Sequence, residues 1–298
     1  MIKPFVALQS NQEHMAMNKH ILSIALTCCF AFSAFAQQSR VNTNFPDGNV
    51  RSISSGGLEV DVVIDRPTIA EADVILCFHG TVSTNDKIIS AARQTLEKVK
   101  GITHRKDILF ISVAYPEEGL LMGDQIPAAE LALLWVKQSA PAELGIHIRK
   151  IFLVGHSQGA YVVVWLNSIH KTDGAIANAP GPIDLCFRCE LEEKRSQAGY
   201  GKVCQLMFDK YGAASTNPEP YQRRSLLAVT QTQLSPLLIV QGMRDSRIQM
   251  RNWPLLKKGL NACKGCAPVQ LLEVADAGHG ALFMDEGAQK AYQAMIGM

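Results

Sequence analysis

Short apolar segments alternate with segments of helical periodicity from residue 58 to the C-terminus. Runs such as "DVILCF" at 73–78 and "DILFISVAYP" at 107–116 are apolar almost throughout, which is typical of strands buried on both faces of a sheet. Further strands are predicted at 58–64, 150–155, 174–182, 235–242 and 268–274, and helices at 87–100, 125–138, 158–170, 249–260 and 285–296. This order predicts an α/β domain with a mostly parallel central sheet and helices on both faces. The first strand, "LEVDVVI", alternates polar and apolar residues and is predicted to be an antiparallel edge strand.

Composition sets limits on size and partners. The chain has 298 residues, of which 47% are hydrophobic and 19% charged, enough to bury the core of one α/β domain. The formal net charge of +2 gives no electrostatic reason to expect nucleic acid or an anionic membrane as a partner.

The N-terminal region has the layout of a secretory signal peptide. A basic segment after Met17 precedes an uncharged, mostly apolar stretch at 21–35, and the small-x-small sequence "AFA" ends at Ala36. The apolar stretch is short for a membrane span, which needs about 20 residues, although a retained anchor is the alternative. We therefore expect residues 1–36 to be removed, with Met17 as the true start, and a secreted or periplasmic domain at 37–298 without stable membrane insertion.

Six cysteines follow the predicted cleavage site. In an exported protein these are candidates for disulfides first. Cys77 lies inside a predicted buried strand and is expected to be an inert thiol, which leaves five disulfide candidates: Cys186, Cys189, Cys204, Cys263 and Cys266. Their pairing is left open. A zinc site built from the two C-x-x-C pairs is the weaker alternative, because no histidine lies near either pair, and we expect no metal.

The segment 184–230 interrupts the alternation of strands and helices. It contains no strong strand pattern, and a loop of this length in a compact domain is usually functional or has structure of its own. We interpret it as a small lid-like insertion, with a surface excursion stapled by disulfides as the alternative.

The sequence "GHSQG" joins a predicted strand to a predicted helix and places Ser157 at the turn. Gly155 and Gly159 flank the serine at the positions where a sharp strand-to-helix turn leaves no room for a Cβ atom. The helix N-terminus that follows directs free N–H groups at whatever the serine attacks. From about residue 58 onward the sequence resembles the α/β-hydrolase superfamily, in which this turn exposes the catalytic nucleophile.

A serine nucleophile needs a base, and the histidines after Ser157 are His170 and His279. His170 is 13 residues further along the same predicted helix, about 20 Å away at 1.5 Å per residue, and is too far. His156 is adjacent to the serine and is expected to point elsewhere. His279 lies in a glycine-rich loop after the last strand, where the resemblance implies the catalytic histidine.

The base needs an acid that holds its tautomer. Asp245, in "IVQGMRD", follows the strand at 235–242 and gives the chain order Ser, Asp, His that the resemblance implies. Asp276 is the competitor, and an ion pair from Asp245 to Arg244 or Arg247 is the alternative structural role.

Acyl transfer also needs hydrogen-bond donors for the developing oxyanion. One is expected to be the backbone N–H of Gln158, the residue after the nucleophile. The pair His79-Gly80 resembles the family's H-G motif, which implies the N–H of Thr81 as the second donor, with Val82 as the alternative. His79 itself is expected to brace the loop.

These features predict a serine hydrolase that cleaves small or medium carboxylic esters through an acyl-enzyme and requires no cofactor. A serine peptidase or amidase uses the same first step and is the alternative. An acyltransferase, and a binding protein on a hydrolase scaffold without catalysis, remain open as further alternatives.

Overall fold

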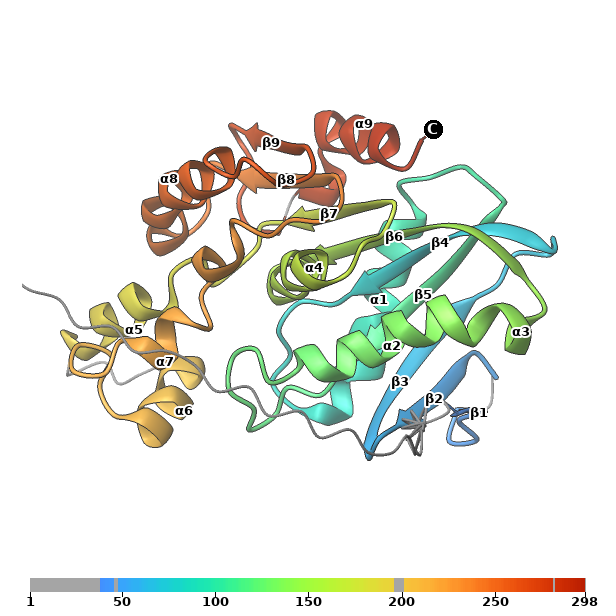
Figure 1. Ribbon diagram of the computed structural model, residues 1–298, viewed down its shortest axis with the longest axis horizontal. Coiled ribbons are helices and arrows are strands. Elements are labelled where there is room, and N and C mark those ends of the chain that lie inside the picture. The colour runs from blue at the N-terminus through green and yellow to red at the C-terminus, as the bar shows by residue number, and fades with distance from the viewer. Residues whose placement is uncertain (1–37, 46–47, 196–200, 281, 298) are drawn as a thin grey trace, which may run out of the picture. The chain divides into compact units, whose positions relative to one another are not determined.

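The computed structural model describes residues 38–45, 48–195, 201–280 and 282–297, so the predicted signal peptide lies outside the described residues. The described chain is built on one sheet with the strand order β1-β2-β3-β5-β4-β6-β7-β8-β9 (Figure 1). The strands are β1 (Gln38–Val41), β2 (Val50–Ser55), β3 (Leu58–Asp65), β4 (Glu71–Phe78), β5 (Ile108–Ala114), β6 (His147–His156), β7 (Gly174–Asn178), β8 (Leu237–Gly242) and β9 (Val269–Val274). The pairs from β1 to β3 and the β3–β5 pair are antiparallel, and all pairs from β5 to β9 are parallel. The sheet is therefore mostly parallel, as the sequence predicts.

The parallel strands end together at one edge of the sheet. Phe78 at the end of β4 pairs with Gly155 in β6, and Asn178 at the end of β7 pairs with both His156 and Val240. Because parallel strands direct their carboxyl ends to the same edge, the loops that follow β4, β6 and β8 converge there.

The strand β3 differs from its predicted place at the edge. It lies between β2 and β5, and β1 and β2 extend the sheet beyond it. Its polar residue Asp61 accepts hydrogen bonds from Ser52 in β2 (2.5 Å) and from Asn42, which follows β1 (3.2 Å). The alternation in the sequence therefore marks a strand with one polar face, whose residue Asp61 is hydrogen-bonded by polar side chains of the neighbouring segments.

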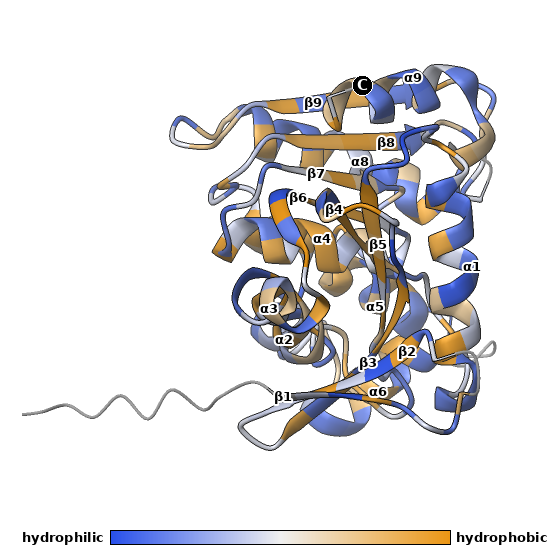
Figure 2. Cartoon of the chain, turned by 90° about the vertical axis from the view of Figure 1, so that its right-hand side faces the viewer, coloured by the Kyte–Doolittle hydropathy of each residue, from blue (hydrophilic) through white to orange (hydrophobic). Residues whose placement is uncertain are grey.

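Helices cover both faces of the sheet (Figure 2). They are α1 (Ile88–Lys100), α2 (Ile126–Gln138), α3 (Ala140–Leu144), α4 (Gln158–Ile169), α8 (Arg247–Asn261) and α9 (Glu286–Met295). The buried residues of α1 and α9 pack on one face, and those of α2, α3, α4 and α8 pack on the other. No helix among the described residues has both the length and the apolar character to span a membrane.

The strand β4 shows how the two faces share the core. Val74, Leu76 and Phe78 pack on the side of α2 and α4, whereas Ile75 and Cys77 pack on the side of α1. All five side chains are buried completely. Burial raises the pKa of the Cys77 thiol, which agrees with an inert cysteine.

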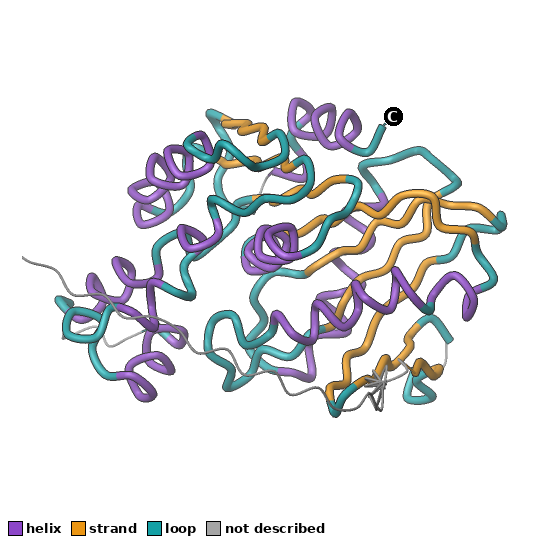
Figure 3. Tube along the Cα trace, in the orientation of Figure 1, coloured by secondary structure: helices purple, strands orange, loops and turns teal. Residues whose placement is uncertain are grey.

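The described residues of the inserted segment at 184–230 form short helices, which follow β7 and precede β8 in the chain and lie to one side of the sheet (Figure 3). It contains α5 (Leu185–Glu193), α6 (Lys202–Tyr211), α7 (Glu219–Gln222) and the 3₁₀ helix η2 (Leu226–Val229). Its buried residues, among them Met207 and Tyr221, join the core on the α4 side of the sheet. The segment therefore has structure of its own, which the sequence left open.

Two disulfides account for four of the five candidate cysteines. Cys189 in α5 is bonded to Cys204 in α6, and Cys263 is bonded to Cys266 just after α8. Cys186 is a free, buried thiol, which corrects its place among the disulfide candidates. It lies one turn before Cys189 on the same helix, and Cys189 bonds across to α6 instead.

Candidate active site

The turn between β6 and α4 holds Ser157 in an unusual backbone conformation. Its φ of 56° and ψ of −118° lie outside the regions that residues with a Cβ normally occupy. A Cβ atom on Gly159 would lie 2.0 Å from the carbonyl oxygen of Phe78, and one on Gly155 would lie 2.3 Å from the carbonyl oxygen of Gly159. Both glycines are therefore required by the close approach of α4 to the ends of β4 and β6.

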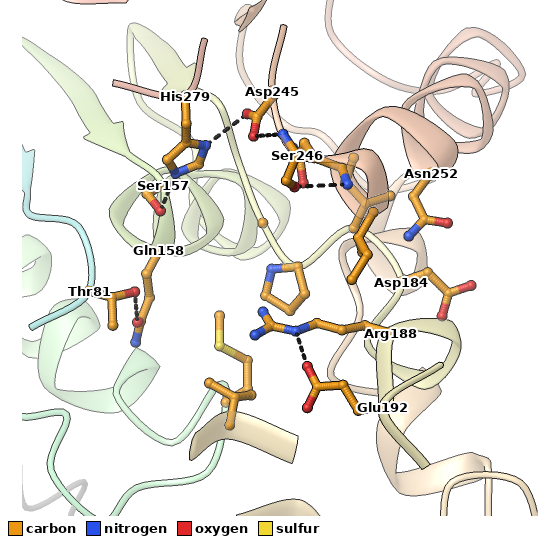
Figure 4. Close-up of a pocket in the computed structure, with 17 residues that line it drawn as sticks. Thr81, Ser157, Gln158, Asp184, Arg188, Glu192, Asp245, Ser246, Asn252 and His279 are labelled. Carbon is orange, nitrogen blue, oxygen red and sulfur yellow. Dashed lines mark hydrogen bonds and ion pairs between the residues drawn. The ribbon is translucent and has the colours of Figure 1, made fainter. Parts of the chain in front are cut away.

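Ser157, His279 and Asp245 form one chain of hydrogen bonds (Figure 4). His279 Nε2 lies 2.8 Å from Ser157 Oγ, and His279 Nδ1 lies 2.8 Å from Asp245 Oδ2. The structure thus brings together three residues that the sequence singled out from three separate loops. A serine hydroxyl, an imidazole and a carboxylate in this order can transfer a proton away from the serine as it attacks.

The loops that carry Asp245 and His279 touch each other at Gly242. A Cβ atom at Gly242 would lie 2.5 Å from the carbonyl oxygen of Ala277 and 2.6 Å from that of Gly278. Only glycine allows this contact between the two loops without a shift of the backbone.

The carboxylate of Asp245 is almost fully buried, with 3% of its side chain exposed. Burial acts to raise its pKa, but hydrogen bonds from His279 and from the N–H of Ser246 (2.6 Å) outweigh it and leave the pKa below its usual value. Asp245 is therefore ionised at neutral pH. The competitor Asp276 is exposed and pairs with Arg244, so it does not contact His279 through any described hydrogen bond.

The loop after β4 lies beside Ser157. A Cβ atom at Gly80 would be 3.5 Å from the Cβ of Ser157. Among the described residues no acceptor lies within hydrogen-bonding distance of the N–H of Thr81. The N–H of Val82 already donates to Glu117 (2.9 Å), which disfavours Val82 as an oxyanion donor. Gln158 is the first residue of α4, and its N–H has no partner within the helix.

A cavity of about 340 Å³ opens in front of Ser157 (Figure 4). It is bounded by the loops that carry Ser157, Asp245 and His279, by α8 and by the first helix of the inserted segment. Its apolar lining consists of Met122, Pro182, Ile183, Val203 and Ile248. A smaller space of about 60 Å³ shares Met122 and Val203 with it. The hydrogen bond from Thr81 Oγ1 to Gln158 Oε1 (2.7 Å) lies in the lining that the two spaces have in common.

Solved structures share this architecture. They include an acylaminoacyl peptidase from Pyrococcus horikoshii (15% identity, TM-score 0.57, covering 82% of this chain and 40% of that chain). They also include Est1E from Butyrivibrio proteoclasticus (13%, 0.58, 84% and 100%) and a butyrate-bound thermophilic esterase from Thermogutta terrifontis (17%, 0.55, 86% and 94%). No protein-family model matches the sequence, and a search of curated proteins finds no match.

This chain has the α/β-hydrolase fold.

This chain covers only about two fifths of the length of the peptidase chain, but nearly the whole length of the esterase chains. The identities are low, so the likeness establishes the fold. The activity rests on the site itself.

One prediction about this α/β-hydrolase site is wrong. The ring of His156 packs against that of His279 with 5.1 Å between centroids, so His156 does not point away from the candidate catalytic residues. Burial, followed by the nearby His279, lowers the pKa of His156 to about 4, so His156 is neutral at neutral pH. Phe283 packs on the ring as well, at 5.8 Å.

His79 occupies the bracing position that the sequence indicated. It is fully buried, stacks on Tyr115 with 4.2 Å between ring centroids, and bonds through Nδ1 to the carbonyl of Gly80 (2.8 Å). Burial lowers its pKa to about 4. Beside it, burial raises the pKa of Glu117 to about 7, even though the N–H of Val82 donates to this carboxylate.

Two glutamines in the site escaped the sequence analysis. Gln241 is the last residue but one of β8 and donates through Nε2 to Asp245 Oδ2 (3.1 Å). Gln249 in α8 donates to Gln241 Oε1 (3.0 Å) and to the carbonyl of Pro180 (2.8 Å). A polar residue inside the apolar run of β8 is the one signal that marks Gln241 in the sequence.

Proposed function

We propose that this protein is a serine hydrolase that cleaves carboxylic esters through an acyl-enzyme intermediate. The observation that carries the proposal is the continuous chain of hydrogen bonds from Ser157 through His279 to Asp245, which ends at a cavity. The apolar part of the cavity lining beside the nucleophile suits the acyl chain of a small or medium ester.

The geometry suggests a role for each group. Ser157 Oγ attacks the acyl carbon while His279 Nε2 takes its proton, and Asp245 stabilises the imidazolium that forms. The N–H groups of Gln158 and Thr81 donate to the oxyanion. His279 then returns the proton to the leaving alcohol, and an attacking water repeats the sequence to release the acid.

We interpret the inserted segment as a lid, because its residues line this cavity. Helix α5 contributes Asp184, its N-cap residue, together with Arg188 and Glu192 to the cavity lining, and α6 contributes Val203. We assign substrate selection to this segment, because it forms one wall of the cavity and none of the triad.

Export is the second part of the proposal. The disulfides Cys189–Cys204 and Cys263–Cys266 support an oxidising compartment, either a periplasm or the extracellular medium. N-terminal sequencing of the protein recovered after export tests this point, and the expected first residue is Gln37. An N-terminus that still includes residues 17–36 would contradict it.

The experiment that tests the chemistry measures release of p-nitrophenol from acetyl to octanoyl esters by the wild type and by Ser157→Ala. We expect turnover by the wild type alone, with a preference for short and medium chains. Labelling of Ser157 by a fluorophosphonate without ester turnover would favour the peptidase or amidase alternative. Absence of both from folded protein would favour a binding scaffold.

A further inference from the structure

Helix α5 places the guanidinium group of Arg188 in the cavity that Ser157 opens onto (Figure 4). The group points from α5 toward the side of the cavity that holds Gln158 and Ser157. About a third of the Arg188 side chain is exposed, 33%. It is the one basic side chain in the lining of this cavity among the described residues, apart from the proposed catalytic base His279.

Glu192 holds this arginine from one side. Its Oε1 lies 3.3 Å from Arg188 Nε, and its Oε2 accepts a hydrogen bond from the N–H of Gly201 (2.8 Å). Within the described part of the chain, neither Nη1 nor Nη2 of Arg188 has a hydrogen-bond partner. The pair of N–H groups at the end of the guanidinium is therefore available to a ligand in the cavity.

The acidic groups in the same lining are already engaged. Asp184 caps α5 by accepting from the N–H of Phe187 (3.0 Å), Glu192 holds Arg188, and Asp245 bonds to His279. These carboxylates therefore do not occupy Nη1 and Nη2 of Arg188. Both nitrogens remain free to donate hydrogen bonds to an anionic ligand in the cavity. Two parallel N–H bonds from the end of a guanidinium match the two oxygens of a carboxylate.

We propose that Arg188 recognises a carboxylate group of the substrate, so that the preferred substrates are esters that carry a free carboxylate on their acyl chain. The proposal rests on the proposed ester hydrolysis. The lining of the same cavity also includes the apolar residues Met122 and Pro182, which suit a short methylene linker between the ester and the carboxylate. Glu192 offsets the charge of Arg188, and Asp184 and Asp245 make the lining acidic overall. The contribution of Arg188 therefore comes from its directed hydrogen bonds and not from the net charge of the cavity.

The test compares acidic and neutral esters of matched length. The acidic substrates are the mono-p-nitrophenyl esters of succinic, glutaric and adipic acids, and the neutral ones are p-nitrophenyl butyrate, valerate and hexanoate. Spontaneous hydrolysis is subtracted with Ser157→Ala. We expect at least one acidic ester to have the higher kcat/KM, and Arg188→Gln to lower that value about 10- to 100-fold while neutral esters change less than about threefold. Arg188→Lys, which keeps the charge but not the paired geometry, is expected to fall between the two.

A matched control is available in the same inserted segment. Arg223 forms an i,i+4 pair with Glu219 in α7, as Arg188 does with Glu192, but it is 65% exposed and does not line the cavity. Arg223→Gln is expected to leave both classes of ester unchanged. Equal losses for acidic and neutral esters in Arg188→Gln, or no loss for either, would overturn the proposal.

A binding measurement separates this proposal from the ester chemistry. Titration calorimetry of glutarate and adipate with Ser157→Ala is expected to show binding that weakens about 10-fold or more when Arg188→Gln is added. That result would support the carboxylate site even if no ester is cleaved. Binding that is absent, or that is indifferent to Arg188, would overturn it while leaving turnover of neutral esters intact.

Discussion

The side-chain amide of Gln241 donates a hydrogen bond to the carboxylate of Asp245, with 3.1 Å between Nε2 and Oδ2. Gln241 is fully buried, and Gln249 fixes the orientation of its amide by donating to its Oε1. The proposed catalytic acid is therefore hydrogen-bonded by a residue that belongs to the core of the sheet. We propose that Gln241 is a positioning residue, which acts on the reaction through Asp245.

Replacing Gln241 should test this role. We expect Gln241→Leu to lower kcat about 10-fold with little change in KM, since a hydrogen bond to a charged group contributes about 1.5–3 kcal/mol. Loss of the donor also removes one of the hydrogen bonds that lower the pKa of Asp245. An unchanged kcat, in a variant that unfolds at a similar temperature, would show that Gln241 is only structural.

The two candidate acids can be separated by matched substitutions. We expect Asp245→Asn to lower kcat about 10³- to 10⁴-fold, because the amide holds the wrong tautomer of His279. Asp276→Asn removes only an exposed ion pair with Arg244 and should change kcat less than about twofold. Steady-state kinetics on p-nitrophenyl butyrate checks both, and a large loss in Asp276→Asn would contradict the assignment.

The glycine after the nucleophile turn should not tolerate alanine. A Cβ at Gly159 would lie 2.0 Å from a backbone oxygen, so Gly159→Ala is expected to lower the free energy of unfolding by at least about 3 kcal/mol. Gly101, which ends α1, has a helical φ of −66° and room for a Cβ. Gly101→Ala is the control and should be neutral or stabilise by up to about 1 kcal/mol in urea denaturation. Equal effects at the two positions would refute the steric argument.

The two disulfides should contribute differently. Chain-entropy arguments give about 3 kcal/mol for Cys189–Cys204, which spans 15 residues, and about 1.5 kcal/mol for Cys263–Cys266, which spans 3. Because α5 carries Arg188, the double variant Cys189→Ser/Cys204→Ser should also reduce the preference for acidic over neutral esters. Cys263→Ser/Cys266→Ser should leave that preference unchanged. If this variant changed the preference and Cys189→Ser/Cys204→Ser did not, the inserted segment would not determine selectivity.

Buried titratable groups beside the active site should make stability depend on pH. His79 and His156 have pKa values near 4 in the folded protein, against 6.5 ordinarily, so each takes up a proton in the unfolded state first as the pH falls below 6.5. Glu117 opposes them, because its folded pKa of about 7 exceeds 4.5 and it binds its proton in the folded state first. Between pH 6.5 and 4.5 the unfolded state therefore binds one proton more than the folded state. As the pH falls through this range, the free energy of unfolding decreases by about 1.4 kcal/mol per pH unit.

Glu117→Gln isolates the opposing group. Its amide oxygen can still accept the hydrogen bond from Val82, but it cannot take up a proton. In this variant the free energy of unfolding, measured by denaturant titration, should therefore depend on pH more steeply, by about 2.7 kcal/mol per pH unit over the same range. A slope that stays the same would show that Glu117 does not titrate with the shifted pKa.

Much of the fold was predictable because burial leaves a local mark. The strands at 73–78 and 235–242 are buried on both faces and read as apolar runs. Strand β2 was missed because four of the six residues in its sequence "VRSISS" are polar, and it is a strand only through its pairing with β1 and β3. The same pairing moves β3 from the edge to the interior of the sheet.

The sequence by itself determined which residues had to lie at the turn and at the strand ends, because glycine spacing and periodicity act within a few residues. Only the tertiary structure decided which distant residues contact each other. Ser157 and His279 are 122 positions apart, and Gln241, His156 and Arg188 gained their roles from contacts between separate segments. Cys189 forms its disulfide with Cys204 and not with Cys186 for the same reason. A periodic pattern reports how deeply one segment is buried, but the partner of each side chain depends on how distant segments pack.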